Sequence, residues 1–446
     1  MKNNVDMILH GSIFKMVCNL SFPNFIGVSS MPLVIIADAY FISQLGNIPL
    51  ASLALVFPFI SLMQMMSAGA IGGGTTSSVS RYLGSGSISK ANSAVWHAII
   101  IGIILSLIYT IIFCVFPKDV FQLMGGNDLV LQGAIAYSQI AFGGSIFIWL
   151  LFILSAMLRA VGDVVTPARV QVIGCIFQIF LAGTLTLGWF DFPSLGIIGP
   201  AIAMVVSHFV MTLYLYFYIK FKQSIITIFP HQINIISILD IMKVGGGGLI
   251  NSITIAGTVA VVTAAVSYHG IEVLAGYGLA SRLEIIITPL VFGIGSVLTA
   301  SVGINVGANQ LIRAKKIAWT GASISFFIIG ILGFVVTFYP EVWLNNFKTN
   351  FLIEEGAILY LVIVAPFYCF FAGGQTLYFA SQGRGKVFFP VIVGILRFLS
   401  VSIICYFAIN LDWSLNTIFY GVSFGLIITG LGLSLCMFSS DWKIID

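Results

Sequence analysis

An isolated carboxyl group lies within the first long apolar stretch of the chain. Asp38 precedes Gly46 by eight residues, which places it about 12 Å along a helix from the end of that stretch. Ionisable groups in the apolar interior of a membrane are costly and commonly mark ion pathways. A carboxyl group there can exchange a proton for a cation, so we predict an ion-coupling role for Asp38. The alternative is a neutral Asp38 that a neighbouring backbone group satisfies.

An imidazole could take part in the same proton chemistry. His208 follows Met204 by four residues, so both side chains lie on one face of a helix. An unperturbed histidine titrates at about pH 6.5, which suits proton exchange. A lone histidine in a helix can equally be a hydrogen-bonded core residue, and this alternative stays open.

Three further charged residues fall within apolar stretches of the second half. Arg282 and Glu284 are two positions apart, so they point to different sides of one helix. A structural clamp and a substrate contact are equal alternatives for this pair. Arg397 lies about 16 Å along a helix from the nearer end of its stretch. We expect Arg397 to make a structural ion pair, for example with Glu284, because a bare cation would repel cationic ligands.

Uncharged side chains complete the candidate site. Tyr40 and Gln64 could line a cavity beside these charges, although either could simply pack. The 38 phenylalanines suit a cavity for aromatic cations and suit lipid contacts equally well. The chain has no HExxH motif, no pair of catalytic aspartates within its apolar stretches and no GxxxxGK[ST] sequence. We therefore expect neither an enzyme nor an ATP-driven motor.

The elements that carry these residues are long apolar runs. Of the 446 residues, 59% are hydrophobic and 8% are charged, against about 25% charged in a soluble domain. This composition excludes a soluble enzyme, a secreted disulfide scaffold and a disordered chain. We predict an all-α integral membrane protein with twelve transmembrane helices. The predicted spans cover 14–45, 49–80, 92–117, 129–158, 168–190, 196–221, 240–268, 272–302, 315–339, 352–380, 387–410 and 416–438.

The two halves of the chain repeat each other at an offset of 223 residues. The matched pairs include Gly84 with Gly307, Trp96 with Trp319, Pro117 with Pro340, Gly162 with Gly385, and Pro167 with Pro390. Six spans per half give both halves the same orientation, so we predict two six-helix lobes related by a pseudo-two-fold axis along the membrane normal. The predicted divisions are an N-terminal lobe at 1–220, a cytoplasmic linker at 221–239 and a C-terminal lobe at 240–446. Four consecutive glycines, Gly245 to Gly248, are expected near the start of span 7, where they would either loosen the entry of the helix or permit close packing.

The distribution of basic residues predicts the orientation. Fifteen lysines and arginines fall in one set of predicted loops, and only Lys118 and Lys348 fall in the other. Positive residues collect on the cytoplasmic side. We therefore expect both termini to be cytoplasmic, in a multi-pass protein of the plasma or inner membrane. The net charge of +4 is spread thinly, so we expect no nucleic-acid partner.

Several short segments resemble the multidrug and toxic-compound extrusion (MATE) family. The most specific is LRAVGD at 158–163, with a Thr-Pro pair at 166–167 beyond it. The further matches are DAYFISQLG at 38–46, GGGTTSSVSRYLGSG at 72–86, GYGLASRLE at 276–284 and NVGA at 305–308. The resemblance extends from about residue 30 to about residue 410, and its Ser-Arg-x-Glu run leans toward the DinF-like branch.

The resemblance implies an ion-coupled antiporter that exports amphipathic, often cationic, organic compounds by alternating access. In the family, an Asp at the position of Asp38 carries ion coupling. Sodium-coupled members often have N-x-x-x-D in span 5, where this chain has Gln178 and, four residues later, Ala182. Met204 replaces a frequent threonine of span 6, and we assign it to the cavity. Because few oxygen ligands remain for sodium, we predict proton coupling through Asp38, with Gln178 and His208 as further candidates and sodium as the alternative.

Two other transport functions stay open. A dedicated exporter of one natural product, such as a siderophore, would fit the departure at Ala182. A lipid-precursor flippase would belong to the same wider MOP superfamily. In each case we expect a small-molecule substrate, contact with membrane lipid and a monomeric chain. We expect no cofactor or bound metal apart from the transported ion.

Overall fold

The structure is a computed structural model that describes residues 2–223, 225–345, 347 and 351–443. Every regular element in these residues is a helix. The first half contains α1 (Lys2–His10), α2 (Ile13–Ser43), α3 (Asn47–Met65), α4 (Gly72–Gly84), α5 (Ile88–Val115), α6 (Pro117–Leu123), α7 (Asp128–Gly143), α8 (Ser145–Ala160), α9 (Val165–Leu187) and α10 (Ile198–Phe221). The second half contains α11 (Ile235–Ser267), α12 (Ile271–Ser281), α13 (Glu284–Gly307), α14 (Leu311–Phe338), α15 (Glu341–Leu344), α16 (Phe351–Val364), α17 (Tyr368–Arg384), α18 (Phe388–Asn410) and α19 (Leu415–Cys436). Lys348, which entered the orientation prediction, lies outside the described residues.

The twelve predicted spans are confirmed as long apolar helices. Eleven helical segments are long and apolar enough to cross a membrane, and α7 with α8, bent by 44°, forms the twelfth. Several spans contain a local break. Span 2 has a π-helical turn at Met66–Ile71 between α3 and α4, and span 10 has a 3₁₀ turn at Ala365–Phe367. The second break contains Pro366, whose missing N–H cannot continue an α-helix.

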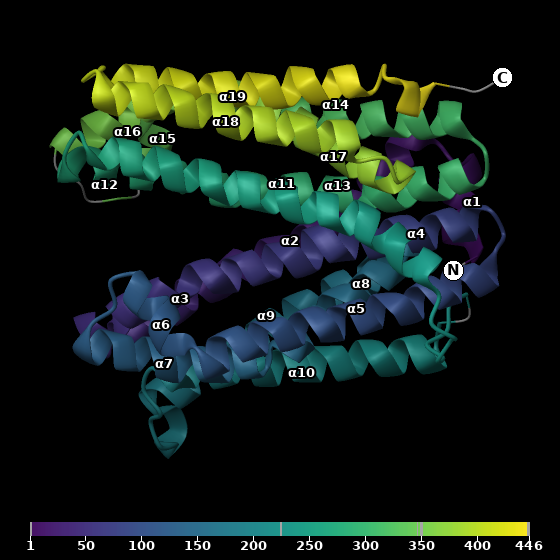
Figure 1. Cartoon of the computed structure of the whole chain (residues 1–446), viewed down its shortest axis with the longest axis horizontal. Coiled ribbons are helices and arrows are strands. Elements are labelled where there is room, and N and C mark those ends of the chain that lie inside the picture. Colours follow the sequence, from purple (N-terminus) through teal and green to yellow (C-terminus); the bar gives the residue numbers. More distant parts are fainter. Residues whose placement is uncertain (1, 224, 346, 348–350, 444–446) are drawn as a thin grey trace.

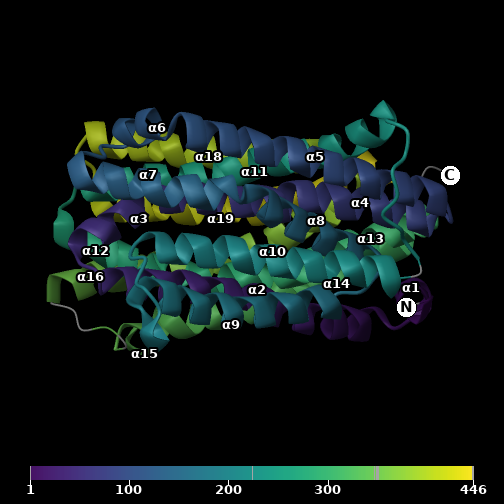
Figure 2. The ribbon, with the colours of Figure 1, turned by 90° about the horizontal axis from the view of Figure 1, so that it is seen from below.

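The helices form two lobes, which confirms the predicted architecture (Figure 1). In that view α2 to α10 make up the lower lobe and α11 to α19 the upper one, and the chain crosses between them after Phe221. The lobes approach each other at the end that holds both termini. They diverge toward the opposite end, where α3, α7, α12 and α16 begin. Figure 2 shows the same helices from below, again with both termini at one end.

Each lobe has a hydrophobic core of its own. The first surrounds the buried Phe142 and Trp149, and the second surrounds Tyr360 and Phe419. A third cluster joins the lobes near the termini, where Met16 and Val17 of α2 belong to the same apolar cluster as Val297 and Leu298 of α13. The lobes are therefore separately packed units that share apolar contacts at one end.

Polar contacts also hold the lobes together. Arg81 of α4 forms an ion pair with Asp240 of α11, at 3.0 Å between Nη2 and Oδ1. Ser78 donates a hydrogen bond to Asp240 Oδ2 at 2.6 Å. Asn24 of α2 donates to the Gly293 carbonyl oxygen of α13 at 2.9 Å. These polar contacts lie at or toward the end where the lobes approach each other, in addition to the apolar contacts of the third cluster.

The glycine run of span 7 permits close packing, which is one of its two expected roles. It does not open the helix, because α11 begins at Ile235, ten residues earlier. Instead, Gly248 faces the backbone of the first lobe, and a Cβ there would lie 2.6 Å from Ala70 Cα. A Cβ at Gly84 would lie 2.0 Å from the Ile304 carbonyl oxygen. The lobes thus pack backbone against backbone, which only glycine permits at these positions.

Candidate functional site

A hollow between the lobes, here called the central cleft, has a volume of about 590 Å³. Its charged and amide-bearing lining residues are Asn24, Gln64, Arg159 and Gln171 from the first lobe, and Asn251, Arg282, Glu284, Gln375 and Gln382 from the second. A second hollow of about 450 Å³, here called the Asp38 pocket, is lined mainly by the first lobe. The two hollows adjoin, because Gln64, Gln171 and Arg282 line both of them.

The Asp38 pocket brings together the three residues predicted for ion coupling. Asp38 on α2, Gln178 on α9 and His208 on α10 all line it, with Met204 beside them. Asp38 is 8% exposed, and its Oδ1 atom has no hydrogen-bond partner among the described residues. No backbone group therefore satisfies this oxygen. A carboxyl oxygen without a fixed donor can gain or lose a proton without breaking a structural contact.

His208 is held by its own helix. Its Nδ1 atom lies 2.8 Å from the carbonyl oxygen of Met204, one turn earlier. A carbonyl oxygen only accepts hydrogen bonds, so Nδ1 carries the hydrogen of the neutral ring. The other ring nitrogen, Nε2, is buried and has no partner in the described part of the chain. This arrangement fits a core histidine and also fits a proton carrier beside Asp38.

Arg282 and Glu284 both line the central cleft, although one continuous helix would point them to different sides. The reason is a break at Arg282 and Leu283, after which α13 begins at Glu284. Tyr360 of α16 donates a hydrogen bond to Glu284 Oε1 at 2.8 Å. Glu284 also lies in the first turn of α13, where the helix dipole favours a negative group. The Glu284 carboxylate is thus fixed in place, whereas the Arg282 side chain is exposed.

Two predicted residues lie outside both hollows. Arg397 is 4% exposed, and its Nη2 donates to Thr254 Oγ1 at 3.3 Å. No ion pair of Arg397 occurs within the described ranges, so the predicted pair with Glu284 is wrong. The physical reason is that α18 points Arg397 at α11, away from the cleft. Tyr40 is 59% exposed on α2, and the structure does not bring it into either hollow.

Sequence reasoning missed several polar residues of the cleft, among them Arg159 and Gln382. Arg159 belongs to the LRAVGD segment and was counted with the loops, yet it is buried and lines the cleft. Gln382 lines the same cleft from the second lobe. The repeat contained the missing signal, because adding the offset of 223 to Arg159 gives Gln382.

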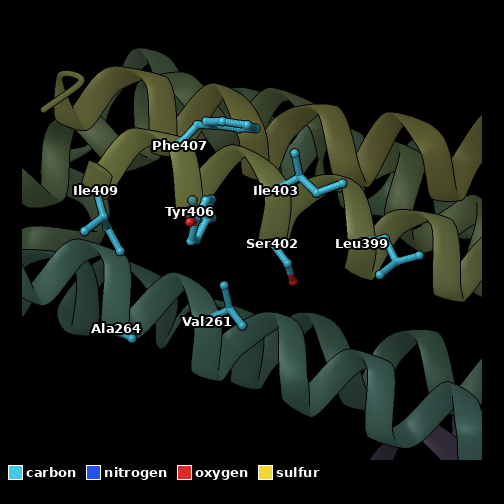
Figure 3. Close-up of a pocket in the computed structure, with 9 residues that line it drawn as sticks. Val261, Ala264, Leu399, Ser402, Ile403, Tyr406, Phe407 and Ile409 are labelled. Carbon is cyan, nitrogen blue, oxygen red and sulfur yellow. The ribbon is translucent and has the colours of Figure 1, made fainter. Parts of the chain in front are cut away.

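A separate apolar groove lies between α11 and α18 (Figure 3). It has a volume of about 450 Å³ and is lined by Val261 and Ala264 from one helix and by Leu399, Ile403 and Tyr406 from the other. Ser402 and the Tyr406 hydroxyl are its polar groups, and none of its described lining residues is charged. The groove therefore offers no ion chemistry, and the candidate site is the central cleft with the Asp38 pocket.

A family model agrees with this architecture. The model for MatE matches residues 23–184 and 249–407. The chain belongs to the MatE (MATE) family. The two matched segments fall in the two lobes, as the internal repeat requires. As a MATE protein, the chain is a multi-pass membrane transporter that exports small compounds, and it is not an enzyme.

Two relatives are described by different transport roles. The probable multidrug resistance protein YoeA of Bacillus subtilis is 24% identical over 366 residues, which cover 80% of this chain and 78% of that protein. The FAD transporter of Shewanella oneidensis is 26% identical over 368 residues, which cover 80% of this chain and 79% of that protein.

Solved MATE structures share the fold. An outward-facing structure of a multidrug resistance MATE family transporter of the MOP superfamily gives a TM-score of 0.87 at 22% identity, over 95% of both chains. A MOP superfamily transporter from Pyrococcus furiosus, whose binding pocket of reverse polarity suggests a different function, gives 0.87 at 21% identity over 96% of both chains. At these identities the likeness establishes the fold alone.

Proposed function

We propose that this MATE transporter is a proton-coupled antiporter that exports amphipathic organic compounds by alternating access. The observation that carries the proposal is the Asp38 carboxyl, whose Oδ1 has no partner in the described residues and whose pocket adjoins the central cleft. A carboxyl in this position favours either a proton or a nearby cationic substrate. Each bound species then weakens the binding of the other, which is the coupling that antiport needs.

A proton suits this pocket better than sodium does. Asp38 is the one carboxylate among the described residues that line it, and Gln64, Gln171 and Gln178 supply only neutral amides. Sodium binding would need several hard oxygens to converge on one point, whereas proton binding needs a single oxygen. His208 lines the same pocket with an unpartnered Nε2, but its Nδ1 is bonded to its own helix, so we assign the coupled proton to Asp38 alone.

The arrangement of the lobes supports alternating access. Their cores are separate, and the contacts that join them include the Arg81–Asp240 ion pair at the end that carries most basic loops. We assign that end to the cytoplasm, with both termini there, in the inner membrane. Opening to the cytoplasm would then break this ion pair while the opposite ends of the lobes come together. The cleft is lined by both lobes of one chain, so a monomer suffices for the proposed cycle.

The test is coupled efflux from proteoliposomes that contain the full chain. Efflux of a fluorescent organic cation is followed first under an imposed proton gradient and then under a sodium gradient, for the parent, Asp38→Asn and Asp119→Asn. Asp119 is an exposed carboxyl outside the cleft and serves as the matched control. We expect the proton gradient to drive efflux in the parent and in the control but not in Asp38→Asn. Undiminished efflux in Asp38→Asn would refute the proposal. Efflux that only a sodium gradient drives would show that sodium, and not the proton, is the coupling ion.

A dedicated exporter of one natural product is the second candidate. A described relative is an FAD transporter, and the cleft of this chain contains two arginines that form no ion pair within the described residues. A siderophore, which carries several anionic oxygens, would suit the same charges. A lipid-precursor flippase has less support, because only three charged residues line the cleft among those described. An exporter of this kind would leave the fluorescent cation untransported under either gradient.

A further inference from the structure

An unpaired arginine lines the central cleft near its closed end. Arg159 is the penultimate residue of α8 and is 6% exposed. Its Nε atom has no hydrogen-bond partner, and its guanidinium forms no ion pair, among the residues that the structure describes. Holding a cation away from water without a counter-charge is costly. An anion from outside the chain would stabilise it.

The nearest carboxylates in the sequence and in the cleft have other partners. Asp163, four residues after Arg159, accepts hydrogen bonds from the Thr166 backbone N–H and from the Tyr218 hydroxyl, both at 3.1 Å. Glu284 of the cleft accepts its hydrogen bond from Tyr360. Neither carboxylate forms an ion pair with Arg159, so its charge remains available to a ligand.

The internal repeat shows that the fold does not require a charge at this position. The residue that matches Arg159 in the second lobe is Gln382, which also lines the cleft. The Gln382 side chain donates to the Gly69 carbonyl oxygen at 3.2 Å, so a neutral amide serves the structure there. Because one lobe folds with an amide at this place, the cation in the other lobe is better explained by binding than by packing.

The rest of the cleft suits an amphipathic ligand with an anionic group. Arg282 reaches the cleft from the second lobe, is exposed and forms no ion pair within the described parts of the chain. Phe152, Phe292 and Phe379 supply aromatic surface in the same hollow. Two arginines and one glutamate are therefore the charged residues, among those described, that line this hollow of about 590 Å³.

We propose that Arg159 forms an anion subsite in the central cleft, which binds the carboxylate or phosphate group of a soluble amphipathic substrate. Its planar guanidinium matches either anion with paired hydrogen bonds. Arg282, nearer the Asp38 pocket, attracts the same group electrostatically, and the aromatic walls hold the apolar body. The inference rests on the central cleft being the substrate path of the proposed transporter. It extends the substrate class from cations to anionic and zwitterionic compounds.

The test compares two ligands that differ by one phosphate group. Riboflavin and flavin mononucleotide share the same fluorescent ring, and only the second carries a phosphate. Their binding to the full chain in phosphatidylcholine nanodiscs is measured by fluorescence anisotropy, without an ion gradient. We expect the parent to bind flavin mononucleotide about tenfold or more tighter than riboflavin, as for hydrogen bonds to a charged group. Failure of proton coupling would leave this equilibrium measurement unaffected, so the two proposals can fail separately.

Three variants separate binding from folding. Arg159→Gln should lose the preference for the phosphate while its riboflavin affinity stays at the parent level, which a misfolded chain could not show. Arg159→Lys keeps the charge without the planar fork and should retain part of the preference. Arg169→Gln removes an exposed arginine near the start of α9 and should bind both flavins as the parent does.

Several results would overturn the inference. A parent that binds flavin mononucleotide no tighter than riboflavin has no anion subsite in its cleft, whatever the variants do. An unchanged phosphate preference in Arg159→Gln would place the subsite elsewhere. If the parent's preference disappears in phosphatidylglycerol nanodiscs at an ionic strength that screens the bilayer charge, a lipid headgroup occupies Arg159, and the assignment to a soluble substrate is wrong.

Discussion

Two carboxyl groups, one in each lobe, line adjoining hollows. They differ in the hydrogen bonds that their oxygen atoms accept. Asp38 lies on α2, and its Oδ1 is buried without a hydrogen-bond donor in the described structure. Glu284 begins α13, accepts a hydrogen bond from Tyr360 and benefits from the helix dipole. The Oδ1 atom of Asp38 has no fixed donor, whereas the side chain of Glu284 is anchored by the Tyr360 hydroxyl. We infer that Asp38 couples transport to the proton and that Glu284 contacts the cationic part of a substrate.

The largest effect should come from Asp38→Asn. Asparagine keeps the size of the side chain but cannot carry a proton, so we expect proton-driven efflux to fall by about a hundredfold or more, on the order of a lost proton-transfer group. Exchange of labelled for unlabelled substrate, without any gradient, should persist. In the parent, efflux should rise as the outside solution is acidified, and in the variant it should not depend on outside pH. If gradient-free exchange falls as much as proton-driven efflux does, Asp38 also binds substrate. The distinction between a coupling role for Asp38 and a substrate-binding role for Glu284 would then be wrong.

Glu284→Gln should impair transport less than Asp38→Asn does, and it should act on substrate affinity and not on proton coupling. Removing the charge weakens the binding of an organic cation by about tenfold, as for other hydrogen bonds or contacts with charged groups. The half-saturating concentration should rise while the maximal proton-driven rate changes little. An uncharged amphipathic substrate of the same shape should be transported as in the parent. A collapse of the maximal rate instead would give Glu284 a coupling role and erase the distinction from Asp38.

Tyr360→Phe sharpens the comparison by removing the support of Glu284 while leaving its charge. We expect the half-saturating concentration for an organic cation to rise about threefold to tenfold, because a hydrogen bond to a charged group contributes about 1.5–3 kcal/mol and water in the cleft replaces part of it. Transport by Glu284→Gln should not weaken further when Tyr360→Phe is added. Additive losses would show that the hydroxyl acts on something other than Glu284.

His208→Gln should have the smallest effect. The Nδ1–H of His208 bonds only to the Met204 carbonyl oxygen of its own helix, and such a bond contributes about 0.5–1.5 kcal/mol. If His208 is a core residue, proton-driven efflux should stay within about threefold of the parent, in line with that single hydrogen bond. A loss as large as that of Asp38→Asn would make His208 part of the proton path. Thermal unfolding of both proteins, measured in the same detergent, would separate this from a stability defect.

The sequence predicted the spans and the first carboxyl because both depend on local pattern. Hydropathy placed twelve helices, and a lone acid in an apolar run singled out Asp38. Sequence-based prediction failed for features that depend on contacts between distant segments. Arg397 bonds to Thr254, 143 positions away, and no spacing rule indicates this. The break before Glu284 was also missed, because Arg282 and Leu283 are good helix formers and contain no proline or glycine signal.

The backbone contact between the lobes has an electrical consequence. A transporter that spends an ion gradient must not let the gradient leak through its closed end. With the Ile304 carbonyl oxygen 2.0 Å from where a methyl group on Gly84 would lie, this part of the seam is filled by protein backbone. A bulkier residue at Gly84 would force the two lobes apart at this contact and admit water. Its first measurable effect would be a passive proton leak, seen as a slow decay of the proton gradient across the vesicle membrane. We infer that glycine at this position helps to keep the closed end of the proposed antiporter impermeable to ions, whatever compound it carries.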